Sequence, residues 1–286
     1  MVPLLKRLHP RRLRRLTILP AILGFAQTPG APIPDPAALL QEVQAHQSRV
    51  DELRENYTFH EITRTETLDG SGAGKTTTTE EHEVFFVNRR RILRLVKRDG
   101  VELTTREREK EQLRVKNEIE AATKGNGGYG RGRGGARAGL VREILAVAKT
   151  SSPRRVVLRG RPSLVFDFAG DPKATAQTRE QSVAKKVTGT VWIDEADKQV
   201  ARLEVRFYDN FRIAGGLVAS VQKGTSVEID QSPLGEGLWM QTGSEQHLAA
   251  RLLIKSYHQN VHVEDFDFRK FDIGTAQKIG SPALKN

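Results

Sequence analysis

The chain has 286 residues, 37% of them apolar and 28% charged, which suits one sizeable core or two small ones and excludes a protein with many membrane spans. Its formal net charge is +11, but six basic residues and no acidic residue lie within residues 1–26, so only +5 belongs to the rest of the chain. A charge of +5 gives no strong indication of a nucleic-acid partner. The absence of cysteine excludes disulfides, thiolate catalysis and an acylated-cysteine anchor on the mature chain.

Residues 1–26 have the order of a secretory signal peptide: basic residues, the apolar run Leu16–Phe25, and small residues before Gln27. Pro20 interrupts the run, and about ten residues cannot cross the roughly 30 Å hydrocarbon core of a bilayer as a permanent helix. We therefore expect cleavage near Gln27 and a soluble periplasmic or secreted protein. A basic arm for a membrane surface or a nucleic acid is the alternative. Two arginine pairs leave the twin-arginine export route open beside the general one: Arg11-Arg12 and Arg14-Arg15.

The first helix is predicted to begin at Asp35, a good N-cap followed by Pro36, and to end at about Arg54. Its apolar residues recur at helical spacing, at Leu39, Val43, Val50 and Leu53. His46 falls in the middle of this apolar stripe, which predicts a hydrogen-bonded core histidine and not a ligand.

A β-hairpin is predicted next, because threonine, valine and aromatic residues dominate both sides of the turn Asp69–Gly74. Its strands are residues 57–68 and 75–87. A further strand over residues 91–97 leads through the turn Asp99-Gly100 to a short strand at Val101.

A second, polar helix is predicted after Thr104, which forms a capping box with Glu107, and Gly125 ends it. Its charges predict a solvated surface helix.

Residues 125–139 are glycine-rich; their G-x-G-x-x-G spacings lack the flanking strand of a nucleotide site, so a mobile loop is expected. A short apolar helix follows over residues 140–148 and includes Ile144 and Leu145.

The central hairpin of the chain is predicted over residues 189–208. Alternation places one set of apolar side chains on its buried face: Val191, Ile193, Leu203, Val205 and Phe207. Val191 then lies opposite Leu203 only if the turn has an odd number of residues, most simply residues 196–198 with Glu195 opposite Gln199. Trp192 is expected to stack on Arg202 from the opposite face.

The remaining chain is predicted to be almost entirely strands bounded by Gly, Pro, Asn or Asp, over residues 154–170 and from Ile213 to Phe268. We therefore expect one α+β domain, a strongly curved antiparallel sheet or unclosed β-barrel with helices covering its concave face.

No catalytic or metal-binding constellation rises above chance. His60 and His82 could approach each other across the first hairpin but lack a third ligand, and His258 and His262 are too far apart along a strand. Asp265 and Asp267 are expected on one face of a strand, about 7 Å apart, as charged strand-edge residues and not as an acid pair. We expect no enzyme, no metal and no cofactor.

The segments 156–170 and 189–207, with the G-x-V-W-I-D turn and the following R-L-E, resemble the outer-membrane lipoprotein-sorting (LolA/LolB-like) superfamily and its exported members. They are also similar to the N-terminal domain of the periplasmic stress regulator RseB. The resemblance implies an unclosed barrel with helices as a lid. The expected organisation is a signal peptide at 1–26, a linker at 27–34, one LolA-like domain at 35–275 with an insertion at 104–139, and a tail at 276–286.

The expected function is a periplasmic carrier for an apolar ligand, such as a lipid or a lipoprotein acyl chain. The candidate cavity lining consists of Val191, Ile193, Leu203, Val205, Phe207, Ile144 and Leu145. The alternative is an interaction or sensor module that binds a protein partner and has no ligand cavity; such a partner could be a membrane protein. We expect a monomer in either case, and no nucleic acid.

Overall fold

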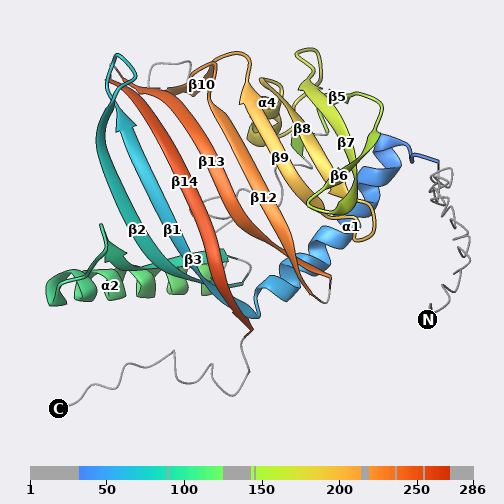
Figure 1. Ribbon diagram of the computed structural model, residues 1–286. Helices are drawn as coiled ribbons and strands as arrows, with labels where there is room; N and C mark the ends of the chain where they lie inside the picture. The colour runs from blue at the N-terminus through green and yellow to red at the C-terminus, as the bar shows by residue number, and fades with distance from the viewer. Residues whose placement is uncertain are drawn as a thin grey trace, which may run out of the picture. The chain divides into compact units, whose positions relative to one another are not determined.

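Figure 1 shows the computed structural model, which describes residues 32–88, 90–124, 143–144, 146–213, 219–235, 237–253 and 255–270. Contacts between Cα atoms divide the chain after Pro32, and Ile33–Asn286 is one compact unit. The expected signal peptide, most of the linker, the glycine-rich loop and the tail lie outside the described residues. Among those residues, no helix is long and apolar enough to span a membrane.

The described helices are α1 (Pro36–Arg54), α2 (Thr105–Thr123) and α4 (Arg179–Ala184). The strands in the first half of the chain are β1 (Tyr57–Leu68), β2 (Gly74–Val87), β3 (Arg90–Arg98), β4 (Val101–Glu102), β5 (Ala148–Thr150), β6 (Arg154–Leu158) and β7 (Arg161–Gly170). Those in the second half are β8 (Val187–Asp194), β9 (Val200–Phe207), β10 (Phe211–Ile213), β11 (Ala219–Val221), β12 (Ser226–Gly235), β13 (Leu238–Leu252) and β14 (Lys255–Lys270).

All fourteen strands belong to one antiparallel sheet, with the order β4-β3-β2-β1-β14-β13-β12-β9-β8-β7-β5. Strand β6 also pairs with β7, while β11 joins β10 to β13. The sheet curves and does not close, and α1 crosses its concave side (Figure 1). This confirms the expected fold class: α+β, with a curved, unclosed antiparallel sheet.

The central hairpin, β8 and β9, confirms most of the predicted register. Val191 pairs with Leu203 and Trp192 with Arg202, whose guanidinium carbon lies 5.7 Å from the centre of the indole ring. The predicted turn is wrong, because a bulge after Trp192 makes Ile193 pair with Val200. The prediction of an odd number of turn residues assumed a regular ladder without such a bulge.

The connection of this hairpin therefore holds four residues, 195–198. The amide of Asp194 donates to the carbonyl oxygen of Gln199 at 2.8 Å, and that of Lys198 donates to the carbonyl oxygen of Asp194 at 3.0 Å. Lys198 takes the left-handed conformation, with φ of 52°, that reverses the chain.

Helix α1 begins as predicted, with the Asp35 side chain accepting a hydrogen bond from the amide of Ala38 at 3.2 Å. The prediction for His46 is wrong, because its side chain is exposed. Leu39 and Val43 pack into one apolar cluster and Val50 into another. His46 lies between those two contacts along the helix, so neither cluster covers it.

Helix α2 is a surface helix with the predicted capping box between Thr104 and Glu107. It does not cover the concave face but lies along the edge of the sheet at β3. Glu111 accepts a hydrogen bond from the amide of Leu95 at 2.7 Å, and Arg114 donates one to the carbonyl oxygen of Leu93. The helix thus supplies partners to backbone groups that an edge strand would otherwise expose.

Candidate functional site on the concave face

The concave face is the face of the sheet that carries Leu203, Ile229 and Val263 and packs against α1. The structure gathers six of the seven predicted cavity residues there, in a first apolar cluster with Leu39 and Val43 of α1. Their exposed fractions are 1% for Val191, 0% for Ile193, 3% for Leu203, 8% for Val205 and 1% for Ile144, while Phe207 is half-buried. Leu145 lies outside the described residues. As ligand contacts, all seven remain a prediction.

Side chains across the concave face change from apolar to polar between β9 and β2. Cross-strand partners share a face, so each register line can be followed over six strands. One line is Leu203, Ile229, Ser244, Val263, Thr63 and Glu80. The next is Val205, Val227, Gln246, Val261, Thr65 and Thr78. Along these two lines the concave face is therefore amphipathic, apolar at β9 and β12 and polar at β1 and β2.

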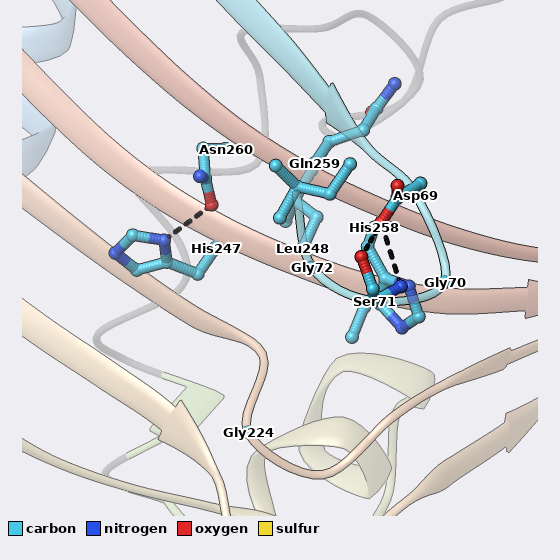
Figure 2. A pocket seen from close by; sticks show the side chains of 12 residues that line it. Asp69, Gly70, Ser71, Gly72, Gly224, His247, Leu248, His258, Gln259 and Asn260 are labelled. Carbon is cyan, nitrogen blue, oxygen red and sulfur yellow. Dashed lines mark hydrogen bonds between the residues drawn. The ribbon is translucent and has the colours of Figure 1, made fainter. Parts of the chain in front are cut away.

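A pocket of about 340 Å³ opens at the rim of the sheet (Figure 2). It lies between the β1–β2 turn, the turn at Gly224 and the adjoining parts of β13 and β14. Its lining combines apolar and hydrogen-bonding residues: Leu68, Asp69, Gly70, Ser71, Gly72, Gly224, His247, Leu248, Ala249, His258, Gln259 and Asn260. We call it the rim pocket. No residue of the rim pocket was among the predicted site residues, because its lining comes from four separate segments of the chain.

Hydrogen bonds within the lining hold the wall of the rim pocket in place. The Asp69 carboxylate accepts from the Ser71 hydroxyl at 2.6 Å and from the amides of Ser71 and Ala73 at 2.8 and 3.0 Å. These bonds, the Ser71 hydroxyl first, lower the pKa of Asp69. A hydrogen bond of 2.9 Å joins His247 Nδ1 and Asn260 Oδ1 and is drawn as a dashed line in Figure 2. This hydrogen bond fixes the orientation of the His247 and Asn260 side chains.

A buried charged cluster lies on the same face, next to Thr63, and consists of Glu61, Arg91 and Asp265. Arg91 Nη2 is 2.5 Å from a Glu61 oxygen and 3.5 Å from an Asp265 oxygen, and all three residues are at most 7% exposed. Gln241 donates to the other Asp265 oxygen at 3.0 Å. Burial alone would raise the pKa of Glu61, but the charge and hydrogen bonds of Arg91 outweigh it and lower this pKa.

The prediction for Asp265 and Asp267 is wrong. The register of β1 and β14 shifts between Thr58 and His60, opposite Asp267, which has a left-handed φ of 54°. This bulge turns Asp267 to the surface, where it pairs with Arg269 at 2.6 Å, while Asp265 is buried on the concave face. Asp265 is thus the buried partner of Arg91 and not a strand-edge charge.

His60 and His82 do not share a face of the first hairpin, since His60 pairs with Glu83 and His82 pairs with Glu61. Among the residues that the structure describes, no three His, Cys, Asp or Glu side chains are grouped as metal ligands would be. His82 is 6% exposed, and within the described part of the chain its Nδ1 atom has no hydrogen-bond partner.

We expect the free energy of unfolding to fall as the pH drops from about 7.5 to 5.5, partly because of His82. Burial lowers the pKa of His82 below its ordinary value of 6.5, although Glu61 and Glu80 oppose the shift. Below pH 6.5 the unfolded chain therefore binds more protons than the folded chain, and stability is lost with falling pH. Thermal unfolding at both pH values should show a smaller loss for His82→Leu than for the wild type. A control at the exposed histidine, His46→Leu, should keep the wild-type loss; equal losses in all three proteins would contradict the role of His82.

No family model matches the sequence, and no curated protein matches it. Among solved structures, the chain is similar to a LolA superfamily protein from Nitrosomonas europaea, with 12% identity and a TM-score of 0.35 over 84% of this chain and 97% of that one. It is also similar to a putative outer membrane lipoprotein-sorting protein domain from Vibrio parahaemolyticus, with 10% identity and a TM-score of 0.32 over 83% and 96%. A third similar structure is in the MucA/MucB complex of Pseudomonas aeruginosa, with 9% identity and a TM-score of 0.24 over 83% and 96%.

Proposed function

We propose that this chain is an exported, non-catalytic binding protein for an amphipathic ligand, such as a lipid or an acylated polypeptide. The observation that carries the proposal is the rim pocket, whose volume of about 340 Å³ combines leucine side chains with histidine, asparagine and serine. Ligand pockets in proteins usually begin at roughly 300 Å³ and combine an apolar lining with a few convergent polar groups.

Of the strand residues that line the rim pocket, Leu248 lies on the concave face, whereas His247 and Asn260 lie on the opposite face. Leu248 lines the rim pocket, and alternation along β13 and β14 places Leu248, Val261 and Val263 on the same face. Leu248 and Val261 are half-buried, whereas Val263 is only 4% exposed. An acyl chain that enters at the rim would follow these side chains toward the first apolar cluster.

The polar part of the ligand has partners on either side of that path. Gln246 and Gln259 share the concave face with Leu248 and Val261, and Thr65 follows on β1. All three are half-buried and carry hydrogen-bonding groups that suit an ester, an amide or a sugar hydroxyl. This composition supports an amphipathic ligand over a purely apolar one.

A second candidate is a module that binds a protein partner and has no cavity under α1. One observation favours it: the predicted cavity residues on β8 and β9 pack together with Leu39 and Val43 of α1. Four of them are at most 8% exposed: Val191, Ile193, Leu203 and Val205. Close packing of this kind stabilises a scaffold and leaves recognition to the outer surface.

Native mass spectrometry with lipid extraction, on protein purified from its own host, separates the two candidates. We expect a co-purifying lipid or acylated species with the wild type. The variant L248Q/V261Q should lose this ligand, because two amides replace the apolar path. Its thermal unfolding should stay cooperative, which would show that the fold is retained. The control Ile62→Gln changes a half-buried residue on the opposite face of β1 and should retain the ligand. Reproducible absence of any ligand, with a polypeptide bound instead, would favour the partner module and reject the carrier.

A further inference from the structure

The tip of the β13–β14 hairpin exposes three large apolar side chains close together. Leu252 is 48% exposed, Leu253 64% and Tyr257 38%. In the rest of the described chain, the exposed large apolar side chains are scattered: Ile33, Val101, Leu113, Val157 and Leu234. A local group of exposed apolar side chains marks a surface that contacts another apolar phase, whereas single ones need no explanation.

The pairing of β13 with β14 shows which side chains of the tip lie on the same face of the hairpin. Leu252 pairs with Lys255 and Ala250 pairs with Tyr257, so Leu252, Lys255 and Tyr257 share the concave side of the hairpin. The Lys255 ammonium lies 5.3 Å from the centre of the Tyr257 ring. Leu253 forms the turn itself, in the left-handed conformation with φ of 52°. The apolar side chains thus project at the end of the hairpin, with a cation beside them.

The segments that form the tip and its neighbouring strand carry cationic but no acidic side chains over a long stretch of sequence. Residues 246–263 contain no aspartate or glutamate but include Arg251 and Lys255. The neighbouring segment, residues 211–227, also has no acidic residue and includes Arg212 and Lys223. Arg212 pairs with Ser220, which pairs with Arg251, so the two arginines belong to one line of the sheet. All four cationic side chains are exposed. An apolar tip with cations beside it complements a membrane surface, which has anionic headgroups outside and an apolar interior.

We propose that the tip of the β13–β14 hairpin docks on an anionic lipid surface. Leu252 and Leu253 enter the acyl region, Tyr257 lies at the level of the headgroups, and Arg251 and Lys255 contact the lipid phosphates. The rim pocket is adjacent, since its residues His258 and Gln259 directly follow Tyr257 in β14. This inference concerns a contact with the membrane and goes beyond the proposed binding of a ligand.

Depth-dependent quenching tests the contact at single residues, because the chain contains no cysteine to interfere. The variants Leu253→Cys, Leu113→Cys and Val157→Cys each carry one fluorophore and are mixed with anionic phospholipid vesicles that carry nitroxides on their acyl chains. Leu113 and Val157 are matched controls, at 61% and 73% exposed, far along the chain from the tip. We expect strong quenching at position 253 and little at the two controls. Equal quenching at all three positions, or none at position 253, would overturn the proposal.

Vesicle flotation of the chain from Gln27 onward, without the basic and apolar residues 1–26, measures the affinity. L252S/L253S should bind anionic vesicles about tenfold more weakly than the wild type, or worse, since two leucine side chains no longer leave water. R251Q/K255Q should bind more weakly by a similar factor at low salt and should lose most of the salt dependence of binding. The control L113S should bind as the wild type does. If the tip variants bind as tightly as the wild type, or if they abolish a concentration-dependent dimer and leave vesicle binding unchanged, the lipid surface is not the partner.

Discussion

Replacing Arg91 by methionine is expected to lower the free energy of unfolding by about 3 to 5 kcal/mol, because it leaves two buried carboxylates without their cation. Glu61 and Asp265 are each 4% exposed, and their shared partner is the guanidinium of Arg91, which also lies 5.3 Å from the centre of the Phe59 ring. Methionine fills most of the same volume, so the loss would report the missing charge and not a cavity. Urea denaturation at pH 7 measures it.

Two further variants make the Arg91 prediction specific. Arg94→Met removes an arginine three residues away on β3 that pairs with Glu83, but its side chain is 42% exposed, so we expect a loss of about 1 kcal/mol or less. Adding Glu61→Gln to Arg91→Met removes one of the uncompensated charges and should recover part of the stability. Equal losses for Arg91→Met and Arg94→Met, with no recovery in the double variant, would mean that the buried cluster is not held by Arg91.

Leu203→Ala is expected to cost about 2 to 5 kcal/mol by the loss of buried methyl groups and the cavity that remains. Leu203 is 3% exposed in the first apolar cluster, and its cross-strand partners are Val191 and Ile229, both buried. Val157→Ala on β6 serves as the control, because Val157 is 73% exposed and its truncation should change stability by about 0.5 kcal/mol or less. Chemical denaturation of both variants decides the comparison, and a Leu203→Ala value near that of Val157→Ala would show that β8 and β9 do not form the core.

The two stability predictions also bear on the proposed function, since they concern opposite ends of the concave face. The first apolar cluster under α1 is a packed support, whereas the charged cluster lies beside Thr63 on β1. A ligand that reaches the buried charges needs polar groups to meet them, because a purely hydrocarbon neighbour would add to the cost of their burial.

The order of the strands in the chain and the side chains that share a face of each strand are properties of the local sequence. Alternation along residues 189–207 correctly predicted that Val191 pairs with Leu203 and that Trp192 stacks on Arg202. The helix caps at Asp35 and Thr104 could also be predicted from the sequence, because a cap depends on residues three or four positions apart. The fold class followed from these elements, since many short strands with tight turns make a curved antiparallel sheet.

The tertiary structure alone decided what depends on contacts between distant segments. Glu61 and Asp265 are neighbours because β1 pairs with β14, a pairing between opposite ends of the chain that no local spacing encodes. The bulges after Trp192 and at Asp267 shift the register by one residue, and one residue is enough to turn a side chain to the other face. His46 is exposed because α1 contacts two clusters that are formed by different strands. The rim pocket and the apolar tip are likewise products of how turns and strands meet at one end of the sheet, and periodicity within a single strand contains no information about its neighbours.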